Sequence, residues 1–235
     1  MTVLLVALGP ALLILTYIYF RDKYEKEPVL LLVRGFAAGA LILVPILIIE
    51  VQTGKLAVNF HPILKAAWDG FIVASATEEI LKFLAVYYLF WNNRNFNEKF
   101  DGIVYSVAVA LGFAAVENFF YVYQGTLGTG LLRAFTAVPA HAIFGIIMGY
   151  YLGMARFRPF RKSGYIFMAI FMPWIFHGLY DFLLLSGHRV LGSLFIPLMV
   201  ILVVIGFRGM KEQSDASVFK YQPQQIDQDE PLAKT

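Results

Sequence analysis

Apolar runs long enough to cross a membrane constrain the fold of this chain more than any other feature. An α-helix needs about 20 apolar residues to span the roughly 30 Å hydrocarbon core of a bilayer, and it pairs its own backbone polar groups. Seven runs approach or exceed this length, at residues 2–20, 29–50, 66–91, 102–123, 131–154, 165–185 and 193–207. With 59% hydrophobic and 15% charged residues, the chain predicts an all-α, polytopic membrane helix bundle of about seven transmembrane helices.

The apolar runs also define the domain organisation. Residues 1–207 predict a single transmembrane domain, and the polar segment 208–235 lacks a sustained apolar period, so we expect a disordered tail. The first run has no basic residues before it and no clear cleavage site, which favours a retained helix over a signal peptide. The chain has no cysteine, which excludes a disulfide framework, a thiolate metal site and a cysteine nucleophile.

The distribution of Lys and Arg predicts the orientation of the chain. With the N-terminus outside, thirteen of these residues fall in inner segments, three in outer segments and three within spans. Positive residues concentrate on the cytoplasmic side of membrane proteins, so we expect an outer N-terminus and a cytoplasmic C-terminus. This bias also explains the net charge of +3, and we expect the lipid bilayer, and no nucleic acid, as a partner.

Ionisable and amide side chains interrupt four consecutive spans. They are Glu78, Glu79 and Lys82 in the third run, Glu117 and Asn118 in the fourth, His141 in the fifth, and His177 and Asp181 in the sixth. A charged residue at a helix centre costs about 2.5–3.5 kcal/mol on insertion scales, so such residues face a bundle interior or a wet cavity. At 1.5 Å per residue, these groups lie between the midplane and the outer third of the membrane. We therefore expect one site that opens towards the outside.

The spacing within two of these spans suggests chemistry. Glu78 and Lys82 are at i and i+4, where the ammonium can hold a carboxylate ionised. His177 and Asp181 have the same spacing, so Asp181 can bond one ring nitrogen and orient the other. The adjacent Glu79 provides a second carboxylate, as a base, an acid or a structural partner. The competing interpretation is structural: an ion pair that sets helix register, with polar bonds between helices.

Four short motifs on successive spans carry a family resemblance. They are E-E-x-x-K at Glu78–Lys82, F-x-x-x-E-N at Phe113–Asn118, H-x-x-x-D at His177–Asp181, and the histidine of "VPAHAIFG", His141. In this order the motifs resemble those of the PrsW family of bacterial membrane proteases. The resemblance extends from "RDKYEKEP" at residues 21–28 to about residue 182.

This resemblance implies a membrane-embedded endopeptidase of the bacterial cell membrane. It would make the first, outer-side cut in a single-span anti-sigma factor, so that a sigma factor is later released in a stress response. The family is related to CAAX prenyl proteases and bacteriocin-processing enzymes. Lys82 and Glu117 depart from the CAAX pattern, which has Arg one residue later and often His, and this disfavours a prenylated substrate.

Two mechanisms and two other function classes stay open at this stage. A carboxylate of Glu78 or Glu79 activates water while His141 and His177, with Asn118, stabilise the developing charges. Alternatively His141, His177 and Glu117 coordinate zinc, and a glutamate of the third run is the base. A proton-coupled transporter also keeps such residues at mid-depth, although no inverted repeat is evident. A non-catalytic scaffold resembling the Aph-1 subunit of γ-secretase is the remaining class. The sequence leaves the oligomeric state undetermined.

Overall fold

A computed structural model describes residues 2–220, and every regular element in this range is helical. The elements are α1 (Thr2–Arg21), α2 (Val29–Gly54), η1 (Lys55–Ala57), α3 (Pro62–Trp68), η2 (Asp69–Ala76), α4 (Thr77–Phe90), α5 (Lys99–Gln124), α6 (Leu127–Phe135), α7 (Ala137–Phe157), η3 (Pro159–Arg161), α8 (Lys162–Leu185), α9 (Arg189–Ser193) and α10 (Phe195–Asp215). The predicted all-α class is confirmed.

Six helical segments of the described chain are long and apolar enough to cross a membrane. They cover residues 2–21, 29–57, 99–124, 127–157, 159–185 and 189–215. The remaining predicted run, 66–91, lies in the continuous helical segment α3–η2–α4, which carries Lys65, Asp69, Glu78, Glu79 and Lys82. These charges make the segment more polar than the six apolar segments.

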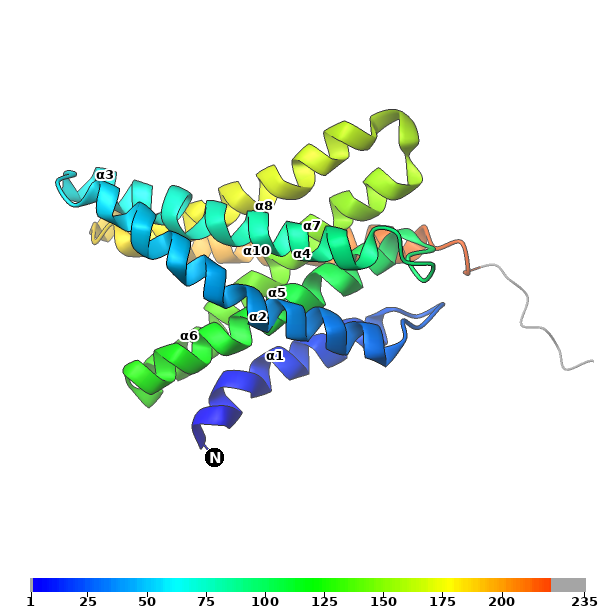
Figure 1. Ribbon diagram of the computed structural model, residues 1–235, viewed down its shortest axis with the longest axis horizontal. Coiled ribbons are helices and arrows are strands. Elements are labelled where there is room, and N and C mark those ends of the chain that lie inside the picture. The colour runs from blue at the N-terminus through cyan, green and yellow to red at the C-terminus, as the bar shows by residue number, and fades with distance from the viewer. Residues whose placement is uncertain (1, 221–235) are drawn as a thin grey trace, which may run out of the picture.

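Helix α5 forms the centre of the bundle. It is buried along most of its length and packs against α1, α2 and α7 (Figure 1). The outer helices instead expose large apolar side chains, such as Leu13 of α1, Leu41 of α2 and Ile196 of α10. A bilayer supplies the apolar surroundings that these exposed side chains require.

Glycines allow α5 to approach its two main neighbours closely. On α7, Gly149 lies against the backbone of Gly102, so a Cβ at Gly149 would collide with the carbonyl oxygen of Gly102. On α2, a Cβ at Gly39 would collide with the carbonyl oxygen of Val109. Small residues at such crossings stabilise membrane bundles through backbone packing, because lipid provides little hydrophobic drive between helices.

The predicted span 131–154 is divided in the structure. Helix α6 ends at Phe135 and α7 begins at Ala137, with Thr136 between them at φ −119° and ψ −67°. Pro139 lies in the first turn of α7, where its missing N–H leaves no intrahelical hydrogen bond unmade. The break therefore falls where the chain can restart a helix at little cost.

Helix α10 ends later than the sequence predicts. It continues to Asp215, eight residues beyond the predicted end of the domain at 207. Two contacts with α7 support this extension: the Gln213 amide donates to the Tyr150 carbonyl at 3.0 Å, and the Tyr150 hydroxyl donates to Glu212 at 2.8 Å. Residues 221–235 of the predicted disordered tail lie outside the described residues.

The connections between helices gather at two opposite ends of the bundle (Figure 1). Connections 55–61 and 186–194 lie at one end, together with α6, and connections 22–28, 91–98 and 158–161 lie at the other. At the second end, Arg156 of α7 ties down the 91–98 connection, since its guanidinium donates to the carbonyls of Trp91, Asn93 and Phe96. The bundle therefore presents two chemically distinct ends.

The close crossing of α5 and α7 leads to a prediction about stability. Gly149→Ala places a methyl group against the Gly102 backbone, and overpacking of this kind costs about 1–3 kcal/mol. We expect a lower unfolding midpoint in detergent, measured by circular dichroism. Gly9→Ala is the matched control, because nothing lies within 4 Å of a Cβ at that position. Equal midpoints for both variants would contradict the proposed role of the crossing.

Candidate functional site

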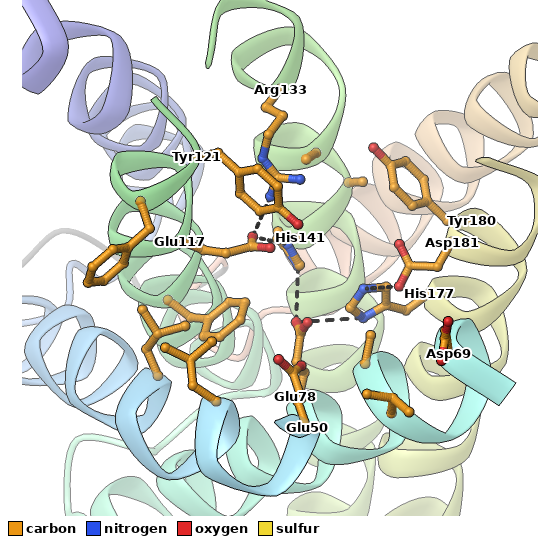
Figure 2. A pocket seen from close by; sticks show the side chains of 18 of the residues that line it. Glu50, Asp69, Glu78, Glu117, Tyr121, Arg133, His141, His177, Tyr180 and Asp181 are labelled. Atoms are coloured by element: carbon orange, nitrogen blue, oxygen red, sulfur yellow. Dashed lines mark hydrogen bonds and ion pairs between the residues drawn. The ribbon is translucent and has the colours of Figure 1, made fainter. Parts of the chain in front are cut away.

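A cavity of about 660 Å³ lies among α2, η2, α4, α5, α6, α7 and α8. Figure 2 shows a continuous line of polar side chains across it, drawn from helices that are far apart in the sequence. In order across the cavity they are Arg133, Glu117, His141, Glu78, His177 and Asp181. The four spans that were predicted to share one site therefore meet in the structure.

A π-helical segment leads directly into the glutamate pair. Segment η2 is a π-helix over Asp69–Ala76, and α4 begins at Thr77. The Trp174 indole of α8 donates to the Phe71 carbonyl at 2.6 Å. The Phe71 ring also fills the space beside Gly178, where a Cβ would collide with it. The wider π turn, a feature frequent at functional sites, is thus held against α8 immediately before Glu78.

The two adjacent glutamates have different environments. Glu78 lines the cavity, and its Oε2 atom accepts a hydrogen bond from the Lys82 ammonium at 2.8 Å. Glu79 is fully buried, and its Oε1 atom lies 2.9 Å from both Lys82 Nζ and His177 Nδ1. Its Oε2 atom has no hydrogen-bond partner within the described chain. Lys82 therefore neutralises part of a buried pair, and only Glu78 faces the cavity.

Each histidine has a carboxylate beside Nε2 and faces the Glu78, Glu79 and Lys82 group through Nδ1. His141 Nε2 is 3.1 Å from Glu117 Oε2, and His177 Nε2 is 3.2 Å from Asp181 Oδ2, in agreement with the i, i+4 spacing. The Nδ1 atoms of His141 and His177 lie 4.0 and 3.9 Å from Glu78 Oε2. The nearest partners of these Nδ1 atoms are Lys82 Nζ, 3.2 Å from His141, and Glu79 Oε1, 2.9 Å from His177. A carboxylate on Nε2 therefore orients each Nδ1 towards the Glu78, Glu79 and Lys82 group.

Two phenylalanines complete this arrangement. The Lys82 ammonium lies 4.2 Å from the centre of the Phe113 ring, a cation–π geometry, and the same ring meets His141 edge-on at 5.4 Å. Phe144 stacks on His177 at 4.8 Å. The Phe and Glu of the F-x-x-x-E-N motif therefore serve neighbouring parts of one site, since Phe113 covers Lys82 and Glu117 bonds His141.

Asn118 does not join the site. Its side chain is fully buried, and its amide lies 3.2 Å from the Val6 carbonyl and 3.5 Å from that of Gly130. These contacts link α5 to α1 and α6, and Asn118 is absent from the described lining of the cavity. The expected supporting role is therefore replaced by a packing role, because the residue after Glu117 points about 100° away around the helix.

Three charged residues that the sequence did not predict for the site also line the cavity: Asp69 of η2, Arg133 and Glu50. Arg133 Nη2 is 2.6 Å from Glu117 Oε2, and its guanidinium stacks over Tyr121 at 3.7 Å from the ring centre. Glu50, near the end of α2, also lines the cavity. A signal for Arg133 and Glu50 existed, since the former is a cation inside a predicted span and the latter ends another at the same side of the membrane.

Four side chains form a group that could hold a metal ion. Glu78, Glu79, His141 and His177 each offer one atom, and these atoms lie within 4.8 Å of one another. Glu117, expected as a ligand, lies instead on the far side of the His141 ring, where it pairs with Arg133. Imidazole and carboxylate donors suit a catalytic zinc ion. The Lys82 ammonium lies beside the same group, 2.8–3.2 Å from Glu78 Oε2, Glu79 Oε1 and His141 Nδ1. The residues present therefore fit a metal, with Glu117 and Asp181 as partners of the ligands.

Comparisons with known proteins find relatives over most of the chain. A family model described as "PrsW family intramembrane metalloprotease" matches residues 27–207. "Protease PrsW" of Shouchella clausii is 37% identical over 218 residues, covering 92% of this chain and 99% of the relative. "Protease PrsW" of Bacillus subtilis is 31% identical, covering 91% and 96%. No solved structure shows a significant match to the chain.

The buried pairing of Lys82 leads to a prediction about stability. Lys82→Met leaves Glu78 and Glu79 without their shared cation, and removing one partner of a buried pair costs about 3–5 kcal/mol. We expect a matching fall in the unfolding free energy, measured by detergent-denaturant titration. The triple variant Lys82→Met, Glu78→Gln, Glu79→Gln should recover much of that loss, because it buries no net charge. A triple variant as unstable as the single one would contradict the electrostatic explanation.

Proposed function

The chain belongs to the PrsW family of intramembrane metalloproteases, and we propose that it hydrolyses single-span membrane proteins in the cavity around Glu78. As a member of this family it is a multi-pass bacterial membrane peptidase. The observation that carries the proposed mechanism is the line of six polar side chains from Arg133 to Asp181, centred on Glu78 Oε2. Residues 1–207 would form its single catalytic domain.

Glu78 is the proposed general base. It is the member of the glutamate pair that lines the cavity, so its carboxylate can take a proton from a water molecule entering there. The oxygen of that water attacks the scissile carbonyl carbon, and the carbonyl electrons move onto its oxygen. Lys82, bonded to both glutamates, holds Glu78 in position for this step.

His141 and His177 are the proposed stabilisers of the developing charges. Their Nδ1 atoms converge on Glu78 from two helices, close to the place where the attacked carbonyl would lie. Without a metal, His177 protonated at Nδ1 can donate to the oxyanion or pass a proton to the leaving amine. His141 Nδ1 accepts from the Lys82 ammonium at 3.2 Å and so helps to hold that positive charge beside the site. Glu117 and Asp181 hold the two rings in this orientation, and Arg133 in turn holds Glu117.

The metal of the family description has a proposed place in the same site. His141, His177 and Glu79 would hold it, which is the two-histidine, one-carboxylate set of several zinc peptidases and leaves Glu78 as the base. Zinc bound there would supply a Lewis acid that acidifies water and polarises the scissile carbonyl. Glu79 belongs to the group of donors within 4.8 Å of one another, whereas Glu117 pairs with Arg133 behind His141, which supports this assignment over a site that uses Glu117.

The proposed topology gives the side of the cut. We propose that α3–η2–α4 also crosses the membrane, as the third of seven spans in chain order, because Glu78, Glu79 and Lys82 are buried in the bundle. With the N-terminus outside, the 55–61 and 186–194 connections lie on the outer side of the membrane, and the cavity lies at this end of the bundle. A cut near this face fits the first, outer-side cleavage of a single-span anti-sigma factor, the substrate class that the family resemblance suggested.

The division of labour between the glutamates leads to a prediction about activity. Glu78→Gln should lower the rate of cleavage by about 10²–10⁴-fold while zinc still binds, because only the general base is lost. Glu79→Gln should lose zinc, and a chelator should inactivate the wild type until zinc is restored. Cleavage of single-span membrane proteins, including an anti-sigma factor, is measured with pure protein in detergent, and metal content by mass spectrometry.

Glu212→Gln, at the opposite end of the bundle, is the matched control and should cleave at the wild-type rate. Unchanged cleavage by Glu78→Gln would overturn the proposed base. If the pure protein cleaves none of a broad substrate set but drives solute uptake into proteoliposomes, a proton-coupled transporter replaces the protease. Stable capture of partner proteins, with processing insensitive to the glutamine changes, would instead indicate a scaffold.

The proposed orientation leads to a separate prediction. The chain has no cysteine, so single cysteines can be placed at the exposed positions Val58 and Phe160 on opposite ends of the bundle. A membrane-impermeant maleimide should label Val58→Cys in intact cells and Phe160→Cys only after permeabilisation, because the basic 156–162 segment is expected inside. The reverse pattern would place the cavity on the cytoplasmic side.

A further inference from the structure

A second cluster of acidic residues lies at the end of the bundle opposite the cavity. It comprises Asp22, Glu25 and Glu27 of the α1–α2 connection and Glu98 and Asp101 at the start of α5; these five residues are called the carboxylate cluster below. Asp101 and Glu117 are separated by 16 residues of the same helix, or about 24 Å at 1.5 Å per residue. The carboxylate cluster is therefore spatially separate from the proposed active site, and no step proposed above uses it.

Hydrogen bonds satisfy only part of the carboxylate cluster. The Tyr105 hydroxyl donates to Glu27 Oε2, and Asp101 Oδ2 accepts the backbone N–H groups of Asn97 and Glu98 at 2.8 Å each. The second oxygens, Glu27 Oε1 and Asp101 Oδ1, have no partner within the described chain, although the two residues are 1% and 0% exposed. A buried oxygen without a partner is costly, so these two atoms indicate a missing ligand.

Carboxylate oxygens of three members of the cluster lie close enough to share one ion. One carboxylate oxygen from each of Glu25, Glu27 and Asp101 lies within 4.8 Å of the others. Two oxygens bound to one Ca²⁺ at 2.3–2.6 Å are at most about 5 Å apart, so this group fits around a single cation. The donors are all oxygen atoms, which select hard cations over zinc or copper.

The charge of the carboxylate cluster is not balanced by side chains. Within the described residues, no ion pair reaches Glu25, Glu27, Glu98 or Asp101. Lys26 donates to the backbone carbonyls of Tyr19 and Asp22 and to none of these four carboxylates. The buried carboxylates therefore need either protons or an added positive charge.

We propose that Glu25, Glu27 and Asp101 bind a hard divalent cation, Ca²⁺ or Mg²⁺, that fastens the α1–α2 connection to the start of α5. This site gives a physical role to the "RDKYEKEP" segment at residues 21–28, which the proposed mechanism leaves unused. The ion would neutralise the carboxylates that the bundle buries. Asp101 lies near the start of α5, and Glu117, which contacts His141, lies near its other end. An ion bound at Asp101 would therefore anchor the same helix that positions His141.

Terbium luminescence tests this proposal directly. Tb³⁺ replaces hard divalent ions on oxygen ligands, and Tyr105, bonded to Glu27, lies close enough to sensitise its emission. Full-length protein in detergent, stripped of metal, should give saturable emission on tyrosine excitation. Ca²⁺ and Mg²⁺ are then titrated against bound Tb³⁺. The ion that displaces Tb³⁺ at the lower concentration is the preferred one. Glu27→Gln and Asp101→Asn should each weaken binding by at least about tenfold.

Two controls locate the ion. Glu79→Gln, which alters the proposed active site, and Asp215→Asn, an exposed carboxylate at the same end as the carboxylate cluster, should both keep wild-type emission. Circular dichroism and gel filtration establish that each variant is folded. Saturable emission that survives Asp101→Asn but disappears in Glu79→Gln would assign the ion to the active site and overturn the proposal.

A measurement on the wild type alone guards against variants that fail to fold. Millimolar Ca²⁺ or Mg²⁺ should raise its unfolding midpoint after chelation, since an ion that binds only the folded state stabilises it. Absence of both saturable emission and any midpoint shift would show that the carboxylates are neutralised by protons.

Discussion

The pairing of Lys82 with Glu78 and Glu79 is the interaction on which the rest of this structure depends. Three ionisable groups within five residues of a membrane helix are costly unless they neutralise one another and are removed from lipid. Neither requirement is met by α4 alone, because Glu79 also needs His177 from α8 and Lys82 lies against Phe113 from α5. The positions of α5 and α8 around α4 therefore depend on these polar contacts as well as on apolar packing.

The short motifs of this chain share one physical design. In two of them, a residue at the site and the residue that holds it lie about one helical turn apart: Lys82 follows Glu78, and Asp181 follows His177. Phe113 and Glu117 instead reach two different partners, Lys82 and His141, from one helix face. Such spacing allows a membrane helix to deliver a polar group together with its compensating contact, which lowers the cost of inserting both.

The two ends of the bundle separate two kinds of chemistry. The cavity end combines imidazole and carboxylate donors with Lys82 and Arg133, so its charges are largely paired. The opposite end holds carboxylates without histidine and with unpartnered buried oxygens. Helix α5 connects the ends, since Asp101 and Glu117 belong to the same buried helix. The two sites therefore share a helix but no ligands.

The sequence by itself determined the apolar spans, the axial depth of the polar residues and the pairs at i and i+4, because these depend on helix rise and local periodicity. It could not determine how each helix is rotated about its axis, since that follows from packing against neighbours. Only the tertiary structure therefore turned Asn118 away from the cavity, placed Glu117 behind His141, and brought Arg133 and Glu50 to the site. The distinction between Glu78 and Glu79 has the same origin, because adjacent residues differ in direction by about 100° and a neighbouring helix decides which one meets water.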